Sequence, residues 1–258
     1  MAVLRTDFYS DVLQLGTSMT VILPEPAATQ IGTEAVQRPG PPPVLYLLHG
    51  LSDDDTMWLR QTSIHRYAAE LGLAVVMPQV HRSFYADLPG TEGRYWTFLS
   101  QELPRVVGAF FNVSRRREDT FVAGLSMGGY GALKWALSQP ERFAAAASLS
   151  GAVDLQALAD LGERRDLIDG ILGGRSVAEV GDVFRLADAV DPAAAPDLFV
   201  ACGTEDVRLI DQNRRLVEHL ERRGMRPRVD FGPGEHEWGY WDRTIQDVLA
   251  WLPIDRAA

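Results

Sequence analysis

Ser126 lies in a Gly-x-Ser-x-Gly pentapeptide, Gly124-Leu125-Ser126-Met127-Gly128, which is the stretch of this chain best suited to chemistry. The apolar run at residues 120–123 before it predicts a buried strand, and the spacing of apolar residues over 130–138 after it predicts a helix. A serine on such a sharp turn exposes its Oγ above the edge of the sheet, and the flanking glycines avoid collisions across the turn. The pattern predicts a nucleophilic serine; the alternative is a glycine-rich turn that contains a serine by chance.

A serine hydroxyl is a weak nucleophile at neutral pH and needs a base that is itself oriented by an acid. Among the five histidines, His236 is the strongest candidate for this base, because it lies in a loop at 232–237 that follows the last predicted strand. The other histidines are weaker candidates: His65 and His219 (inside predicted helices), His81 (in a loop that could contact substrate) and His49 (at a strand end, where it would brace the loop beside the nucleophile).

The acid is expected after the preceding strand, and Asp206 is our choice. Its short carboxylate can reach the Nδ1–H of His236, fix the tautomer and stabilise the imidazolium formed during attack. The neighbouring Glu205 is the alternative, whereas Asp191 and Asp197 are typical of turns or strand starts. The single cysteine, Cys202, is expected to be a buried strand residue and not a nucleophile.

Backbone N–H groups are expected to stabilise the negative oxygen of a tetrahedral intermediate. The first should come from Met127, after the nucleophile, and the second from Leu51, after the His49-Gly50 pair. For substrate binding we select four residues near these positions: His49, Gly50, Trp58 and Trp238. The acidic run Ser52-Asp53-Asp54-Asp55 lacks the spacing of a calcium loop, so we interpret it as an N-cap with first-turn acids of the following helix, and we expect no metal.

The elements around these residues alternate between strand and helix, which predicts an α/β protein with a mostly parallel central sheet flanked by helices. The expected strands are 12–23 (in a hairpin-like opening), 44–48, 74–77, 120–123, 143–149, 197–201 and 228–231, and the expected helices are 58–71, 96–111, 130–138, 207–223 and 238–251. The proline-rich stretch 24–43 is expected to be a surface loop. We expect one domain over 1–258, with a small lid or cap insertion at 151–190.

Composition excludes several classes of protein. The 258 residues include 46% hydrophobic and 23% charged side chains, as in ordinary globular proteins, and a formal net charge of -10 argues against nucleic acid as a partner. One cysteine permits no intramolecular disulfide. The first ten residues contain Arg5 and Asp7 and do not resemble a secretory signal, and no apolar run is long enough to span a membrane, so a cytoplasmic location is expected.

The chain resembles the esterase D and tributyrin esterase branch of the α/β-hydrolases, which also includes S-formylglutathione hydrolases, feruloyl esterases and mycolyltransferase antigen proteins. The matching segments are Tyr46-Leu47-Leu48-His49-Gly50-Leu51, Gly124-Leu125-Ser126-Met127-Gly128-Gly129-Tyr130-Gly131-Ala132 and Leu149-Ser150-Gly151, with Asp206 and His236 where the triad acid and base would fall. This resemblance implies an α/β-hydrolase fold and hydrolysis of short-chain carboxylic esters through an acyl-enzyme on Ser126. It also implies a small-molecule ester substrate and no cofactor; a homo-oligomer is left open.

Two other functions fit parts of the pattern. A thioesterase such as an S-formylglutathione hydrolase would use the same residues, although that group usually carries histidine before the nucleophile, where this chain has Leu125. A binding protein with a hydrolase fold that has lost catalysis is the other alternative, and the presence of Ser126, Asp206 and His236 together argues against it.

Overall fold

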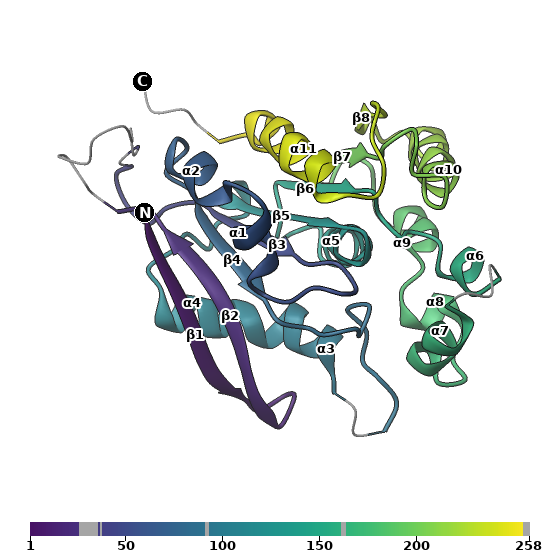
Figure 1. Ribbon diagram of the computed structural model, residues 1–258, viewed down its shortest axis with the longest axis horizontal. Helices are drawn as coiled ribbons and strands as arrows, with labels where there is room; N and C mark the ends of the chain where they lie inside the picture. Colours follow the sequence, from purple (N-terminus) through teal and green to yellow (C-terminus); the bar gives the residue numbers. More distant parts are fainter. Residues whose placement is uncertain (26–35, 37, 91–92, 161–163, 255–258) are drawn as a thin grey trace.

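A single eight-stranded sheet occupies the centre of the structure (Figure 1). The computed structural model describes residues 1–25, 36, 38–90, 93–160 and 164–254. Within them the strands run in the spatial order β1-β2-β4-β3-β5-β6-β7-β8. Their bounds are Ala2–Ser10 (β1), Leu15–Leu23 (β2), Val44–Leu48 (β3), Ala74–Pro78 (β4), Thr120–Leu125 (β5), Ala145–Leu149 (β6), Asp197–Ala201 (β7) and Arg228–Asp230 (β8).

Strand directions agree with the predicted architecture. The β1–β2 hairpin is antiparallel and joins the sheet by antiparallel pairing of β2 with β4, whereas β3 to β8 are parallel to their neighbours. The carboxyl ends of β3, β5, β7 and β8 therefore lie at one edge of the sheet, where the loops that follow them can meet. The expected α/β class with a mostly parallel sheet is confirmed.

Helices cover both faces of the sheet. Alternate residues of each strand point to opposite faces, so apolar side chains lie on both faces and both must be covered. Leu45 and Leu47 of β3 belong to the core cluster that includes residues of α1, α2 and α11, whereas Tyr46 and Leu48 belong to the cluster that includes residues of α3, α4, α5 and α10. Figure 1 shows α11 and α4 on opposite sides of the sheet. The bounds are Met57–Gln61 (α1), Ile64–Ala69 (α2), Tyr95–Thr97 (α3), Leu103–Phe110 (α4), Met127–Ser138 (α5), Ile210–Arg222 (α10) and Trp238–Trp251 (α11).

The structure divides two of the predicted helices. The helix expected over 58–71 is interrupted at Thr62, whose Oγ1 donates to the Trp58 carbonyl at 2.5 Å and accepts from the Ile64 N–H at 3.2 Å. Such local side-chain bonds compete with helical backbone bonds. The helix expected over 96–111 consists of α3, a π-helical turn at Phe98–Glu102, and α4.

In its described residues, the segment predicted as a lid contains four short helices: Leu155–Asp160 (α6), Arg165–Leu172 (α7), Val177–Val180 (α8) and Val183–Ala189 (α9). Figure 1 shows them grouped at the side of the molecule near α5 and α10. Its function as a lid, like the single-domain assignment, stays a prediction. Most of the expected loop at 24–43 lies outside the described residues, as do residues 161–163. No helix in the described ranges is long and apolar enough to cross a membrane.

Ser126 joins β5 to α5 in a backbone conformation that non-glycine residues rarely adopt, with φ +54° and ψ −117°. Three hydrogen bonds hold it there: its N–H donates to the Leu149 carbonyl at 2.9 Å, and its carbonyl accepts from the N–H groups of Tyr130 (3.1 Å) and Ala152 (3.0 Å). Strained residues of this kind persist only where the surroundings hold them. The turn therefore depends on β6 and α5 as much as on its own sequence.

The glycines of the pentapeptide are required by close backbone packing. A Cβ on Gly128 would lie 2.3 Å from the Leu48 carbonyl oxygen of β3, and a Cβ on Gly124 would lie 2.4 Å from the Gly128 carbonyl oxygen. In each case the clashing atom belongs to the backbone and cannot rotate away. Only glycine lets the first turn of α5 pass this close to β3 and β5.

Gly128→Ala is therefore expected to destabilise the fold by about 1–3 kcal/mol, the usual cost of forcing a methyl group into a packed core. The matched control is Gly16→Ala in β2, where a Cβ meets nothing within 4 Å. That change should be neutral or stabilise by about 0.4–1 kcal/mol. Urea unfolding of both variants measures the difference, and equal midpoints would contradict the steric explanation.

Candidate active site

The structure brings Ser126, His236 and Asp206 into one chain of hydrogen bonds. Nε2 of His236 lies 3.1 Å from the Ser126 Oγ, and its Nδ1 lies 2.7 Å from Oδ2 of Asp206. The Asp206 side chain is 2% exposed and that of His236 is 28% exposed, so the acid is shielded from water while the base is reachable. With Nδ1–H bonded to the carboxylate, Nε2 is left free to accept the serine proton.

Extension of the β7–β8 pairing beyond the sheet places the acid beside the base. Backbone N–H groups of Thr204 and Glu205 donate to the carbonyls of Gly232 (2.9 Å) and Gly234 (3.0 Å), so the two loops are joined like adjacent strands. A Cβ on Gly203 would lie 2.0 Å from the Gly234 carbonyl oxygen. Glycine at this point allows the close approach that puts the Asp206 carboxylate within reach of the imidazole.

Glu205 has a different role from its neighbour. Its carboxylate accepts a short hydrogen bond from the Gly234 N–H, and this bond holds the pKa of Glu205 below its usual value. The side chain therefore fixes the turn that carries His236 and does not contact the imidazole in the described structure. Of the two acids that the sequence left open, the structure places Asp206 against His236.

Trp241 and Ser150 support the base, and sequence reasoning assigned neither of them to the site. The indole of Trp241 lies edge-on to the imidazole of His236, with ring centres 4.8 Å apart, and its Nε1–H donates to Ser150 Oγ at 3.1 Å. Ser150 itself has φ +45° and donates its N–H to the Ala201 carbonyl at 2.7 Å. In the sequence, only the Leu149-Ser150-Gly151 motif pointed to Ser150. The contact of Ser150 with Trp241 of α11 depends on the tertiary fold, so the motif could not reveal it.

Both expected oxyanion donors are available. Among the described residues, neither the Leu51 N–H nor the Met127 N–H has a hydrogen-bond acceptor. Leu51 lines the cavity, and Met127 begins α5, where the positive end of the helix dipole favours a negative oxygen. The pair therefore fits the anion-stabilising role predicted for it.

His49 supports this loop from behind. Its imidazole is buried, its Nε2 accepts the Val80 N–H at 3.2 Å, and its Nδ1 lies 2.7 Å from the Gly50 carbonyl oxygen. Since Nε2 accepts, Nδ1 carries the proton and donates; burial, which lowers the pKa of His49, also favours this neutral form. A trans peptide points its C=O and N–H in opposite directions, so this bond aims the Leu51 N–H away from His49.

Two of the four predicted substrate contacts need correction. His49 does not line the cavity, because its ring is turned toward the protein interior. Trp58 does not line it either: its buried indole donates to the Leu48 carbonyl at 3.0 Å and packs edge-on against Trp238. Gly50 and Trp238 do line the cavity, so Trp58 acts as a support for Trp238.

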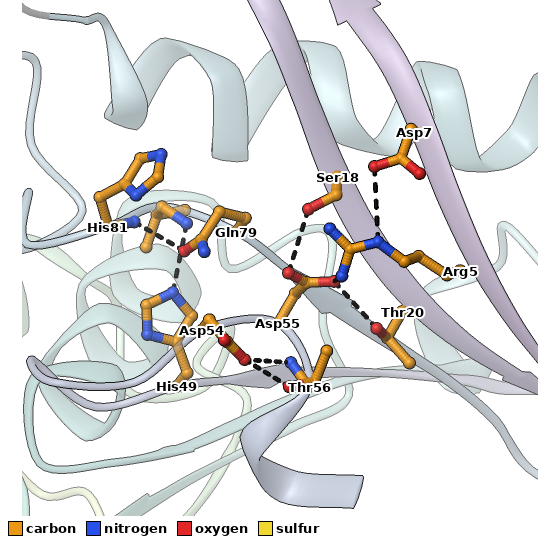
Figure 2. A network of polar contacts seen from close by, with 11 residues as sticks. Arg5, Asp7, Ser18, Thr20, His49, Asp54, Asp55, Thr56, Gln79 and His81 are labelled. Atoms are coloured by element: carbon orange, nitrogen blue, oxygen red, sulfur yellow. Dashed lines mark hydrogen bonds and ion pairs between the residues drawn. The ribbon is translucent and has the colours of Figure 1, made fainter.

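The interpretation of the acidic run as a helix cap is wrong. The helix α1 begins at Met57, with no acid in its first turn and no capping side chain on Thr56. Each carboxylate accepts from a donor outside helix α1: Asp53 accepts from the Gly50 N–H, Asp54 from Thr56, and Asp55 from two hydroxyls of β2. Figure 2 shows Asp55 between Ser18 and Thr20, with the guanidinium of Arg5 beside it. The run thus attaches the loop to the hairpin.

A cavity of about 1320 Å³ opens over Ser126. Its walls come from the loops after β3 and β4, from α6 and α7, and from the start of α11; the lining includes Leu51, His81, Phe84, Leu158, Ile171 and Trp238. The predicted loop histidine, His81, is exposed at this wall. Cys202 is buried, and burial raises the pKa of its thiol to about 12, as expected for a residue that is no nucleophile.

Comparison with known proteins identifies relatives along nearly the whole chain. Residues 14–252 match the family model named Esterase, described as Putative esterase. An acetyl esterase of Caldicellulosiruptor saccharolyticus is 28% identical over 270 residues, which covers 98% of this chain and 98% of that protein.

Two solved structures from Staphylococcus aureus are similar at 35% identity. The fluorophosphonate-binding serine hydrolase F, with substrate bound, has a TM-score of 0.87 and covers 98% of this chain and 99% of its own. The S-formylglutathione hydrolase FrmB, as apoenzyme, has a TM-score of 0.82 and covers 98% of each chain. These matches confirm the predicted α/β-hydrolase fold and the resemblance stated above.

Asp206→Asn is expected to lower kcat on p-nitrophenyl acetate by roughly 10⁴-fold, because an amide favours the wrong imidazole tautomer. Glu205→Gln is the matched control: it keeps an acceptor for the Gly234 N–H and should reduce kcat much less. Melting temperatures of both variants verify folding. The assignment of the acid is contradicted if Glu205→Gln is the more damaging change.

Proposed function

The chain belongs to the Esterase family, whose model spans residues 14–252, and on that premise we propose that it hydrolyses short-chain carboxylic esters through an acyl-enzyme on Ser126. The protein is a serine hydrolase of the carboxylic ester hydrolase class. The observation that supports the catalytic assignment is the chain from Ser126 Oγ through His236 to Asp206, with distances of 3.1 and 2.7 Å, at the floor of the cavity.

In the first half of the reaction, Ser126 Oγ attacks the ester carbonyl carbon while His236 Nε2 takes the hydroxyl proton. The tetrahedral intermediate then collapses: the bond between carbon and the alcohol oxygen breaks, and His236 returns the proton to the departing alcohol. Asp206 stabilises the imidazolium throughout and keeps its own negative charge.

In the second half, water attacks the acyl-enzyme carbonyl and gives a proton to His236. Collapse of the second intermediate breaks the bond to Ser126 and releases the carboxylic acid, with the proton returned to Oγ. In both intermediates the N–H groups of Leu51 and Met127 bind the negative oxygen; loss of one such donor usually costs roughly 10²- to 10³-fold in rate.

The size of the cavity does not restrict the substrate to a small ester. Its volume of about 1320 Å³ exceeds the range typical of small-molecule sites, roughly 300–1,000 Å³, so it holds more than an acetyl group and a small alcohol. The lining is mixed: the apolar side chains of Phe84, Leu158 and Ile171 lie in it together with charged ones, which include Arg82, Arg164 and Arg208. Similarity to an acetyl esterase supports a short acyl group.

A thioester substrate is the second candidate, because a relative at 35% identity is an S-formylglutathione hydrolase. The same nucleophile, base and oxyanion donors serve both reactions, so the described site does not discriminate between oxygen and sulfur leaving groups. Leu125 before the nucleophile favours the oxygen ester in our assignment.

A panel of p-nitrophenyl esters from acetate to octanoate, with S-formylglutathione included, tests the proposal. We expect the highest kcat/KM on the shortest oxygen esters. Ser126→Ala should lower kcat by on the order of 10⁶-fold, as removal of a triad serine does elsewhere. A higher kcat/KM on S-formylglutathione would replace the carboxylesterase by the thioesterase, and near-normal turnover by Ser126→Ala would contradict the mechanism.

A further inference from the structure

Tyr85 lies in the loop after β4 and is completely buried, although Phe84 before it and Leu88 further along the loop line the cavity. Its hydroxyl donates to the His49 carbonyl oxygen at 2.8 Å. His49 immediately precedes Gly50 and Leu51, the segment that carries one proposed oxyanion donor. A buried phenol hydroxyl without a partner is costly, so this bond fixes the loop and the side chain against each other.

Tyr85 is also fixed to α5, the helix that carries Met127. The buried Nζ of Lys134 donates to the Tyr85 carbonyl oxygen at 2.8 Å and lies 4.4 Å from the ring centre of Trp96. The Tyr85 ring packs against Gly131, where a Cβ would lie 2.4 Å from its Cδ2. One residue therefore contacts both elements that supply the two N–H donors.

The backbone at this residue has a positive φ, as that of Ser126 does. Tyr85 has φ +50° and the preceding Phe84 has φ +49°, a region that costs non-glycine residues about 1–3 kcal/mol. The Lys134 Nζ, which donates to the Tyr85 carbonyl, and the Ser83 hydroxyl, which accepts from the Tyr85 N–H at 3.1 Å, hold the strained segment in place. The loop thus adopts a costly conformation that presents the phenol to His49.

We propose that Tyr85 is a positioning residue that sets the separation of the two oxyanion donors, Leu51 N–H and Met127 N–H. This inference rests on the proposed function. Two donors stabilise one oxygen only if both reach it at about 2.7–3.1 Å. Without the hydroxyl, the His49 carbonyl loses its partner and the loop relaxes away from α5, while the His49 bonds to Val80 and Gly50 still preserve its general path.

Burial also raises the pKa of Tyr85 well above its ordinary value, so the phenol stays protonated and remains a donor throughout the pH range of an assay. Tyr130 provides a close comparison. It lies on α5, is equally buried, and its hydroxyl donates to the Gly181 carbonyl at 2.8 Å, but that carbonyl belongs to the predicted lid and not to the oxyanion loop.

The experiment compares Tyr85→Phe with Tyr130→Phe on p-nitrophenyl acetate. Each removes one buried hydrogen bond to a backbone carbonyl, so both should lower the melting temperature by similar amounts. Expressed per active site titrated with a fluorophosphonate, kcat should fall roughly tenfold to a hundredfold for Tyr85→Phe with little change in KM. Tyr130→Phe loses only the hydroxyl bond to Gly181 and keeps the backbone N–H that donates to the Ser126 carbonyl, so its kcat should stay within about twofold of wild type.

A transition-state analogue provides a readout that a purely structural role would not change. An alkyl trifluoromethyl ketone adds to Ser126 and places a negative oxygen in the oxyanion site. Its Ki should therefore rise for Tyr85→Phe by about the same factor as kcat/KM falls, while the Ki of the product acid stays constant.

Equal kcat and equal analogue Ki for the two variants would overturn the role of Tyr85, provided that wild type is active. If wild type hydrolyses no ester in the panel, the proposed function fails instead, and this inference fails with it. The two failures are distinguished by the activity of wild type and Tyr130→Phe.

Discussion

The close approach of α5 to β3 is the constraint on which the site depends. At Gly128 the helix passes so near the Leu48 carbonyl that no side chain fits, and at Gly124 the same holds between strand and helix. Where the helix starts, Ser126 has φ +54°, and a serine on such a sharp strand-to-helix turn exposes its Oγ above the sheet edge. The N–H of Met127 is released at the same point, so one piece of backbone geometry supplies both a nucleophile and an oxyanion donor.

Backbone pairing brings the acid to the base, and a buried side chain orients the second oxyanion donor. Bonds between the loops after β7 and β8 carry Asp206 to His236, and the His49 imidazole orients the Gly50–Leu51 peptide. Because hydrogen bonds and glycine contacts hold these loops before substrate arrives, little reorganisation is needed during the reaction. Such preorganisation is the largest single contribution to catalysis in many enzymes.

Sequence patterns predicted those parts of the site whose chemistry depends on local structure. The strand at 197–201 and the helix at 238–251 were predicted from the alternation of strand and helix patterns. The pentapeptide is a motif with a fixed relation to its elements, and Asp206 and His236 were chosen for their places after predicted strands. Errors arose where partners distant in sequence decide the outcome. Asp55 is held by hydroxyls of β2 and Trp58 by the Leu48 carbonyl. The contact of Tyr85 with His49, which spans 36 residues, was not predicted at all. No periodicity encodes such pairings.

Mass spectrometry of the protein after reaction with a fluorophosphonate tests the central claim most directly. If the Ser126 hydroxyl is activated by His236, the folded wild-type protein should gain one phosphonyl group per chain, and peptide mapping should locate it on Ser126. Thermal unfolding before the reagent is added should abolish labelling, because activation depends on the folded arrangement. A folded protein that gains no phosphonyl group, or gains it on another residue, would contradict the account.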